Sequence, residues 1–287
     1  MKKITKALFP IAGMGTRLLP ATKAIPKELL PVYDRPILEV LVEEVVDAGI
    51  EEIVFVTSRK KSALENHFDA YPELEQKLEE EGKTELLEKI RKFKDIKFTY
   101  VRQAEPKGDG HAILCAEHLF GDEPFLVIFG DELLFGSPSS IDQLLGAYAQ
   151  TQASVIGVRH VPTAEISSYG VVAPLVAAEQ EGIFPIQGVV EKPRPEEAPS
   201  NFAVIGKYVC TPEVWDALKK AKKSVNGETR LIDGFAEILA EGGPLYAAEL
   251  KGSRFDTGNP KGLFFANLYS ALQNGVSKAE ITAFLEH

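Results

Sequence analysis

The alternation of short apolar runs with segments of helical periodicity constrains the fold of this chain more than any other feature of its sequence. In the first half the predicted strands span residues 7–12, 52–57, 97–102 and 124–129, and the predicted helices span 35–48, 61–68 and 111–118. Asp34 is the expected N-cap of the first of these helices. Parallel strands need a connection of a dozen or more residues, which is most often a helix. The pattern therefore predicts an α/β fold, a Rossmann-like three-layer sandwich whose central sheet is mostly parallel.

The second half continues this pattern without an internal repeat or a flexible linker. Its predicted strands span 153–158, 170–174, 186–191, 203–209 and 245–250, and its predicted helices span 212–221, 231–240 and 260 to the end. The highly charged stretch 73–94 has helical periodicity with few apolar positions, which predicts a helical insertion on the surface. We therefore expect one continuous unit over residues 1–287, with insertions on the substrate side of the sheet.

Charge is distributed unevenly along the chain. The formal net charge is −10, which argues against a nucleic-acid partner, because binding a phosphate backbone needs a basic face. Residues 1–27 nevertheless contain six Lys or Arg and no Asp or Glu. A local cationic segment in an acidic protein suits a small polyanion such as a triphosphate.

The sequence contains no apolar stretch of the roughly 20 residues that span a bilayer, so we expect no membrane partner. Pro10 and Gly13 interrupt the apolar run after Lys6, and no signal peptide is expected. Cys115 and Cys210 both lie in apolar contexts, as reduced buried cysteines do. These features favour the cytoplasm.

A glycine-rich turn follows the first predicted strand, in Ala12-Gly13-Met14-Gly15-Thr16-Arg17. Glycines after a strand let backbone N–H groups approach a phosphate closely. The turn is not a P-loop, and Leu18 stands where a dinucleotide-binding motif has its third glycine, which disfavours a Rossmann dehydrogenase. Beyond the turn, Arg17, Lys23 and Lys27 supply positive charge on a loop that its prolines restrain.

The stretch GMGTRLLPATKAIPKELLPV, residues 13–32, resembles the signature of the sugar nucleotidyltransferases. Within them it is most similar to the bacterial UTP–glucose-1-phosphate uridylyltransferases, through KAIPKE at 23–28 and ENHFD at 65–69. The similarity continues through SSYGVV, EKP and APSNFAVIGKYV and covers nearly the whole chain. It implies transfer of a uridylyl group from UTP to glucose 1-phosphate, with UDP-glucose and pyrophosphate as products.

The resemblance also implies roles for individual residues. Nucleotide binding falls to Ala12, Gly13, Gly15, Thr16, Gln103 and Gly108, and catalysis to Arg17, Lys27 and Lys192. Sugar binding falls to Gly170, Glu191 and Lys192, and Mg²⁺ binding to Asp131 and Asp256. Two carboxylates suffice for this ion when substrate phosphates complete its coordination.

The implied mechanism is a direct in-line attack of the sugar phosphate on the α-phosphate of UTP, assisted by Mg²⁺. The attacking phosphate is already ionised, so no general base is required. On this basis residues 1–135 form the nucleotide-binding part, and residues 136–287 the sugar-phosphate part with the C-terminal helices. Relatives also imply a homo-oligomer, a dimer or a tetramer.

Three departures from the family pattern leave the choice of base and sugar open. Asp109 stands where leucine is usual and is expected near the base, Gly130 replaces a proline, and Arg230 and Ile232 replace glutamine and threonine. One alternative is a sibling enzyme that uses dTTP or a different sugar 1-phosphate. Another is a non-catalytic nucleotide-sugar sensor on the same fold, although a sensor need not retain both aspartates.

Overall fold

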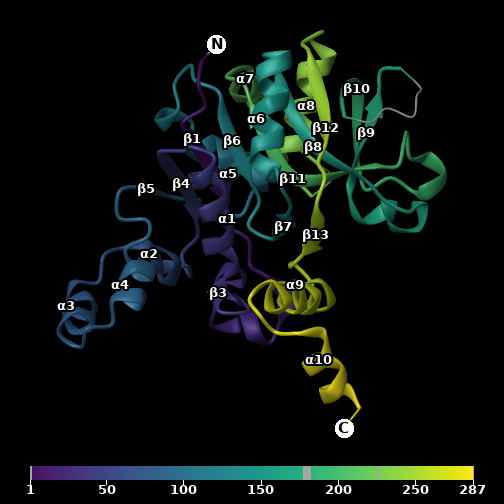
Figure 1. Cartoon of the computed structure of the whole chain (residues 1–287). Helices are drawn as coiled ribbons and strands as arrows, with labels where there is room; N and C mark the ends of the chain where they lie inside the picture. Colours follow the sequence, from purple (N-terminus) through teal and green to yellow (C-terminus); the bar gives the residue numbers. More distant parts are fainter. Residues whose placement is uncertain (1, 177–181, 225, 287) are drawn as a thin grey trace.

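The computed structural model describes residues 2–176, 182–224 and 226–286. Nine strands form the main sheet: β1 (Lys6–Pro10), β4 (Glu52–Thr57), β5 (Lys97–Arg102), β6 (Phe125–Ile128), β8 (Ser154–His160), β9 (Gly170–Pro174), β10 (Ile183–Glu191), β11 (Phe202–Cys210) and β12 (Leu245–Glu249). Their order is β5-β4-β1-β6-β11-β8-β12-β10-β9 (Figure 1).

The expected mostly parallel sheet is only partly correct. The strands β5, β4, β1 and β6 are parallel, as are β8 and β12. However, β10 and β11 run opposite to the other seven strands and pair antiparallel with each of their neighbours. Pro174 and Ile183, which end β9 and begin β10, are separated by too few residues for a crossover helix, so those two strands pair antiparallel. The result is a mixed sheet in an α/β fold.

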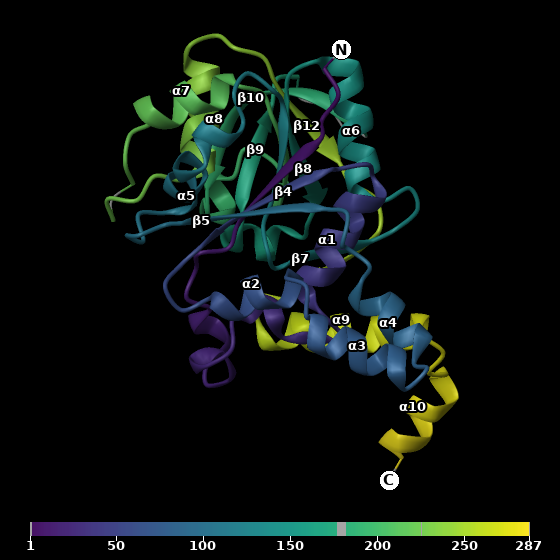
Figure 2. The ribbon, with the colours of Figure 1, turned by 90° about the vertical axis from the view of Figure 1, so that its left-hand side faces the viewer.

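Helices cover both faces of this sheet: α1 (Ile37–Asp47) and α6 (Ser140–Thr151) on one face, and α5 (Asp109–Cys115), α7 (Glu213–Lys220) and α8 (Leu231–Ala240) on the other. In Figure 2 the two groups lie on opposite sides of the strands. Alternate strand residues supply the two apolar layers. Ala7 and Phe9 of β1 pack in the layer under α1 and α6, whereas Leu8 packs in the other layer.

Several shorter elements lie outside the main sheet. The strands β2 (Pro31–Val32) and β3 (Arg35–Pro36) pair with each other, and so do β7 (Glu132–Phe135) and β13 (Ser253–Asp256). The remaining helices are α2 (Ser62–Phe68), α3 (Pro72–Glu80), α4 (Thr84–Ile90), α9 (Pro260–Gln273) and α10 (Lys278–Leu285). None of the described helices has the length and apolar character that crossing a bilayer requires.

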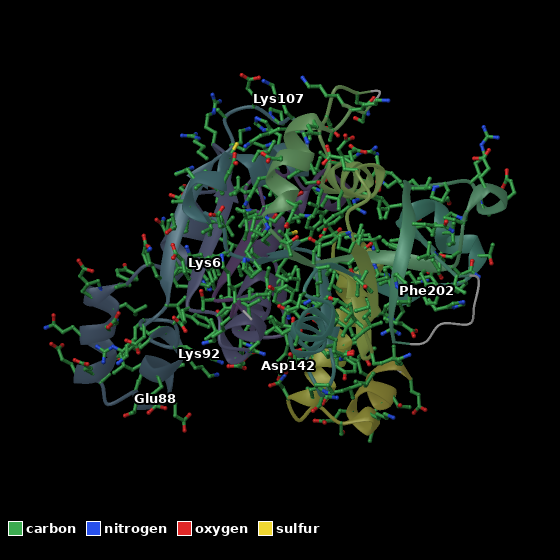
Figure 3. All side chains as sticks on the ribbon, turned by 90° about the horizontal axis from the view of Figure 1, so that it is seen from above. Lys6, Glu88, Lys92, Lys107, Asp142 and Phe202 are labelled. Carbon is green, nitrogen blue, oxygen red and sulfur yellow. The ribbon has the colours of Figure 1, made fainter. Side chains whose placement is uncertain are left out.

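The predicted helical insertion at 73–94 is confirmed as the α3–α4 pair. Viewed from above, this pair projects from one side of the molecule with Glu88, opposite the side that carries Phe202 (Figure 3). The N-cap prediction for Asp34 is wrong, because Arg35 and Pro36 form β3 and the helix begins only at Ile37. The sequence patterns also did not predict α6, β7 or β13.

Candidate active site

The loop after β1 folds into three short 3-10 turns, Thr16–Leu18, Ala21–Lys23 and Lys27–Leu29. Gly15 has φ +67°, a conformation that L side chains rarely adopt, and the Thr22 hydroxyl donates a 2.7 Å hydrogen bond to its carbonyl oxygen. A Cβ at Gly15 would lie 3.3 Å from the Cβ of Lys27. The glycine therefore lets the loop fold back on itself, which brings Lys27 beside the turn.

A cavity of about 830 Å³ lies beside this loop, and we call it the basic cavity. Its lining includes Ala12 and Gly13 from the turn, Gln103 just after β5, and five cationic residues, Lys23, Lys27, Arg59, Lys60 and Lys61. No Asp or Glu is among the residues that line it. The basic cavity therefore suits a polyanion whose uncharged end extends over apolar surface.

The contribution of Arg59, Lys60 and Lys61 was missed in the sequence. These residues lie just beyond the end of the buried strand β4, which is next to β1 in the sheet, and so they reach the same edge as the glycine turn. Lys61 is 5% exposed and donates 2.7 Å hydrogen bonds to both carboxylate oxygens of the buried Glu28, which ties the two loops together. Burial lowers the pKa of Lys61.

Gln103 is buried and its side chain points into this region. Its Nε2 donates a 2.9 Å hydrogen bond to the carbonyl oxygen of Gly108 and lies 2.9 Å from Nδ1 of His111. Among the described residues, no donor contacts its amide oxygen, which can accept a hydrogen bond from a ligand. Gly108 has φ +97°, and a Cβ there would lie 2.3 Å from the Thr229 carbonyl oxygen, so only glycine fits.

Three charged side chains meet where the basic cavity adjoins a second cleft. Lys27 Nζ lies 2.6 Å from Asp131 Oδ2, and an Arg17 guanidinium nitrogen lies 3.7 Å from the same oxygen. Burial acts to raise the pKa of Asp131, but the charge of Lys27 and its hydrogen bond outweigh it and hold that pKa below its usual value. Burial likewise opposes the ammonium form of Lys27, and Asp131 overcomes it to raise the Lys27 pKa.

Asp131 and Asp256 are brought together by the β7–β13 ribbon. Asp131 directly precedes β7, and Asp256 ends β13 opposite Glu132. A Cβ at Gly258 would lie 2.8 Å from Asp131 Oδ2, 2.9 Å from Asp256 Oδ1 and 3.0 Å from an Arg17 guanidinium nitrogen. The two carboxylates therefore converge on one point, which only a glycine leaves open.

The donor set at this point fits Mg²⁺ and does not form a complete protein cage. Two convergent carboxylates match what this ion takes from proteins when a phosphate supplies further oxygens. Within residues 2–176, 182–224 and 226–286, no cluster of three or more His, Cys, Asp or Glu could hold a metal ion. The Lys27 ammonium beside Asp131 shows that the position favours a cation.

The second cleft has a volume of about 460 Å³, and we call it the mixed-charge cleft. It contains Arg17, Asp131 and Asp256 together with Gly170, Glu191 and Lys192. Gly170 and Glu191 are directly opposite on β9 and β10, and a Cβ at Gly170 would lie 3.2 Å from a Glu191 carboxylate oxygen. Lys192 has φ +47°, and its backbone N–H donates a 3.0 Å hydrogen bond to the carbonyl oxygen of Tyr169.

A half-buried ion pair connects this cleft to the ribbon. Arg254 of β13 donates hydrogen bonds of 2.8 and 2.6 Å to the two carboxylate oxygens of Glu132. The same guanidinium lies over the Tyr169 ring, 4.7 Å from its centroid. Burial raises the pKa of Glu132 to about 7. Arg254 thereby fixes the ribbon that carries the two aspartates to Tyr169, the residue that precedes Gly170.

Asp109, Arg230 and Ile232 all line the mixed-charge cleft. Asp109, expected near the base, lies in the wall of this cleft and not in that of the basic cavity. The cause is α8, whose first backbone N–H, from Leu231, donates a 2.7 Å hydrogen bond to Asp109 Oδ1. Gly130 lies against the core, where a Cβ would be 2.8 Å from Ile11.

The predicted site residues thus fall into three groups. Ala12, Gly13, Lys27 and Gln103 line the basic cavity. Arg17, Asp131, Gly170, Glu191, Lys192 and Asp256 line the mixed-charge cleft. The remaining three, Gly15, Thr16 and Gly108, line neither cavity. Gly15 shapes its loop, and the carbonyl oxygen of Gly108 accepts a hydrogen bond from the Gln103 side chain.

Comparison with known proteins gives concordant matches. Residues 7–272 match the family model described as nucleotidyl transferase. A UTP–glucose-1-phosphate uridylyltransferase of Bacillus subtilis (strain 168) is 43% identical over 287 residues, which cover 100% of this chain and 97% of that protein. The structure of a UTP-bound UGPase from Acinetobacter baumannii has a TM-score of 0.90 with 36% identity, over 99% of both chains. A UDP-glucose pyrophosphorylase complexed with UDP-glucose has a TM-score of 0.83 with 39% identity, over 94% of this chain and 100% of that one.

Proposed function

The chain belongs to the nucleotidyl transferase family, and we propose that it transfers the uridylyl group of UTP to glucose 1-phosphate, forming UDP-glucose and pyrophosphate. The observation that carries the proposal is the meeting of two cavities at Arg17, Lys27 and Asp131. One cavity is cationic and suits a triphosphate. The other mixes carboxylates with cations and suits a phosphorylated sugar.

UTP occupies the basic cavity. The amide oxygen of Gln103 accepts a hydrogen bond from the imide edge of the uracil, and the backbone of Ala12 and Gly13 faces the nucleotide. The triphosphate meets the positive charge of Lys23 and Lys27, which offsets its own. Residues 1–135 supply this cavity, and we propose them as the nucleotide-binding part of a single domain over 1–287.

Glucose 1-phosphate occupies the mixed-charge cleft. The Glu191 carboxylate accepts hydrogen bonds from sugar hydroxyl groups, with Gly170 leaving room for the ring. Lys192, whose side chain is 61% exposed, binds the phosphate and reduces its repulsion by the triphosphate. We propose residues 136–287, which include these three positions, as the sugar-phosphate part.

The transfer itself is a displacement at phosphorus. An oxygen of the sugar phosphate attacks the α-phosphorus of UTP, the bond from that phosphorus to the bridging oxygen of the β-phosphate breaks, and pyrophosphate leaves. Arg17 and Lys27 stabilise the charge that builds up on the phosphoryl oxygens. No side chain needs to remove a proton, because the attacking oxygen is ionised.

Asp131 and Asp256 hold Mg²⁺ in this proposal. When bound, the ion neutralises charge on the α-phosphate and orients the leaving pyrophosphate. Gly258 keeps the space between the two carboxylates open, and the ribbon of β7 and β13 fixes their separation. Lys27 moves its hydrogen bond from Asp131 to a phosphate oxygen when the substrates arrive.

We further propose that the chain acts as a homo-oligomer, a dimer or a tetramer. The C-terminal helices carry exposed apolar side chains that a partner subunit would cover: Phe264, Phe265, Phe284 and Leu285. Sedimentation velocity over a range of concentrations measures the state directly. A monomer at micromolar concentration would contradict this part of the proposal.

Pyrophosphate release tests the reaction. The purified protein is incubated with glucose 1-phosphate, Mg²⁺ and each of UTP, dTTP, ATP, CTP and GTP in turn. We expect release with UTP and little with the others, and no release with UTP when EDTA replaces Mg²⁺. Release with dTTP alone would show that the proposed choice of uracil as the base is wrong. Binding of UTP without release, for every sugar 1-phosphate offered, would indicate a sensor.

A further inference from the structure

Asp109 lies in an unusual position for a charged side chain. It begins α5, is half-buried, and lines the mixed-charge cleft together with Glu191, Tyr208 and Arg230. The backbone around it is held firmly: Thr229 N–H donates to Lys107 O and Gly110 N–H donates to Thr229 O, both at 2.9 Å. Asp109 is therefore a fixed part of the cleft wall.

The Asp109 carboxylate lacks a cationic partner among the described residues. Arg230 is the nearest candidate, but its guanidinium donates hydrogen bonds of 3.0 and 2.7 Å to the two oxygens of Asp233. Of the other residues that the structure describes, Leu231 alone donates a hydrogen bond to Asp109, from its backbone N–H at 2.7 Å to Oδ1. Burial accordingly raises the Asp109 pKa to about 6, since this hydrogen bond only partly offsets it and Glu191 adds a second negative charge.

An unpaired carboxylate in a cleft wall costs stability unless a ligand uses it. Neighbouring groups identify the ligand's side of the cleft. Tyr208 lies close enough to Asp109 and Glu191 for their charges to add to the effect of burial in raising its pKa. Glu191 is the residue proposed above to accept from sugar hydroxyls. Asp109 therefore faces the same part of the cleft as the sugar ring.

The residue type matters because the family resemblance implies leucine at this position. A leucine side chain can only pack against a sugar, whereas a carboxylate accepts a hydrogen bond from a hydroxyl group. A site with a buried acceptor rejects an analogue that lacks the donor, because the acceptor is left unpaired. It also repels a second carboxylate.

We propose that Asp109 is a specificity-determining residue: its carboxylate accepts a hydrogen bond from one hydroxyl group of the sugar and excludes sugar 1-phosphates with a hydrogen or a carboxylate there. The inference rests on the proposed function, because it places a sugar 1-phosphate in the mixed-charge cleft.

The test compares kcat/KM for glucose 1-phosphate with that for its 2-, 3-, 4- and 6-deoxy analogues and for glucuronic acid 1-phosphate, all at saturating UTP. In the unmodified protein we expect at least one deoxy analogue to lose about 10- to 100-fold relative to glucose 1-phosphate. Asp109→Leu should reduce the loss for one of these analogues to less than about 3-fold. A loss that is unchanged for every analogue in Asp109→Leu would overturn the inference.

Asp109→Asn separates charge from hydrogen bonding. The amide oxygen can still accept from the Leu231 N–H and so preserves the start of α8. We expect this variant to keep most of the discrimination against the deoxy analogue, because an amide still pairs with a hydroxyl. If the sensitive hydroxyl is at position 6, glucuronic acid 1-phosphate should gain at least about 10-fold in Asp109→Asn. If it is at another position, this substrate should not change.

Asp142→Leu is the matched control. Asp142 is also in the first turn of its helix, where it completes the capping box of α6, but it lies outside both the basic cavity and the mixed-charge cleft. The Asp142→Leu variant should lose thermal stability without altering the ratio of kcat/KM between any two sugar 1-phosphates. If Asp109→Leu does not fold, Asp109→Ala, which also removes the acceptor, decides, and unchanged ratios of kcat/KM there again contradict the inference. Absence of turnover with every sugar in the unmodified protein would instead refute the proposed function.

Discussion

The basic cavity and the mixed-charge cleft meet at one aspartate, yet they are built on different electrostatic principles. Lys23, Lys27, Arg59, Lys60 and Lys61 line the basic cavity, and no carboxylate faces it. Asp109, Asp131, Glu132, Glu191 and Asp256 line the cleft, together with Arg17, Lys192 and Arg230. A net positive surface attracts a triphosphate, whereas a sugar is recognised by hydrogen-bond acceptors at fixed positions.

On the proposed function, affinity for the nucleotide and discrimination among sugars therefore belong to separate surfaces. Cations in the basic cavity attract any triphosphate, whereas the contact that we propose to the base is made by the directional amide group of Gln103. In the cleft most charges are already engaged with each other, as Arg254 is with Glu132. Substitutions in the two regions should therefore have different kinetic consequences.

The largest effect is expected where the two regions meet. Asp131→Asn and Asp256→Asn should each lower kcat by about 10³-fold or more, because each removes a carboxylate from the proposed metal site. UTP should still bind to the basic cavity within about 3-fold of the unmodified affinity. Turnover and titration calorimetry measure the two quantities.

Asp122→Asn, at an exposed aspartate that lines neither the basic cavity nor the mixed-charge cleft, serves as the control and should leave both quantities unchanged. A kcat within 10-fold of the unmodified value in both Asp131→Asn and Asp256→Asn would show that the ribbon carboxylates are not the metal ligands.

A second substitution affects both regions because Lys27 contacts Asp131 from the basic cavity. Lys27→Gln should lower kcat/KM by about 10²-fold for UTP and for glucose 1-phosphate alike, since it removes charge stabilisation at the phosphorus. Initial-rate kinetics with each substrate varied in turn provide the measurement. A decrease in kcat/KM for UTP alone would mean that Lys27 acts only in nucleotide binding.

Smaller, opposite effects should separate the two regions. Lys60→Gln should raise KM for UTP by about 3- to 10-fold and leave KM for glucose 1-phosphate unchanged, because an exposed cation contributes modestly. Lys192→Gln should do the reverse. Both effects should diminish as salt is increased from 50 to 500 mM, since salt screens exposed charges. Equal changes in both KM values for either variant would contradict the assignment of UTP to the basic cavity and of glucose 1-phosphate to the mixed-charge cleft.

The smallest effect concerns stability. Asp109 has a pKa of about 6 in the folded protein against 3.8 without the fold, so the folded state binds more protons between these values. The free energy of unfolding of the unmodified protein should therefore fall as pH rises from about 4 to about 6 because of this group. Relative to it, Asp109→Asn should gain about 1 to 2 kcal/mol across that interval.

Urea unfolding at pH 4, 5, 6 and 7 measures this difference. Asp142→Asn provides the comparison: its stability relative to the unmodified protein should not increase with pH over the same interval. The difference in free energy of unfolding between Asp109→Asn and the unmodified protein could also stay constant from pH 4 to pH 7. That result would mean that Asp109 is not held in a destabilising position.

Local sequence patterns predicted the parts of the molecule whose causes are local. The strand at 52–57 and the surface helices within 73–94 were found because periodicity is visible in a short window. The glycine turn and Lys27 could be related to one another because 13–32 is a single continuous motif. The arrangement of that motif around a cationic cavity follows from the chain folding back at Gly15.

Distant pairings could not be predicted in this way. The β7–β13 ribbon joins two four-residue strands from separate regions of the chain, and neither strand has a periodic pattern long enough to recognise. The position of Asp109 depends on the start of α8, which is remote in the sequence. Arg59 and Lys60 resemble ordinary surface residues until their position at the edge of the sheet is known.

The β7–β13 ribbon also has a consequence for how such a protein can diversify. The spacing of Asp131 and Asp256 is set by the pairing of Glu132 with Asp256 and of Phe135 with Ser253, at the two ends of the ribbon. The chain leaves the ribbon after Phe135 and returns to it at Ser253, and the pairing of these two residues holds the ends of the intervening segment together. Insertions, deletions or exchanged segments within it can remodel the proposed sugar site while the distance between the two carboxylates stays unchanged.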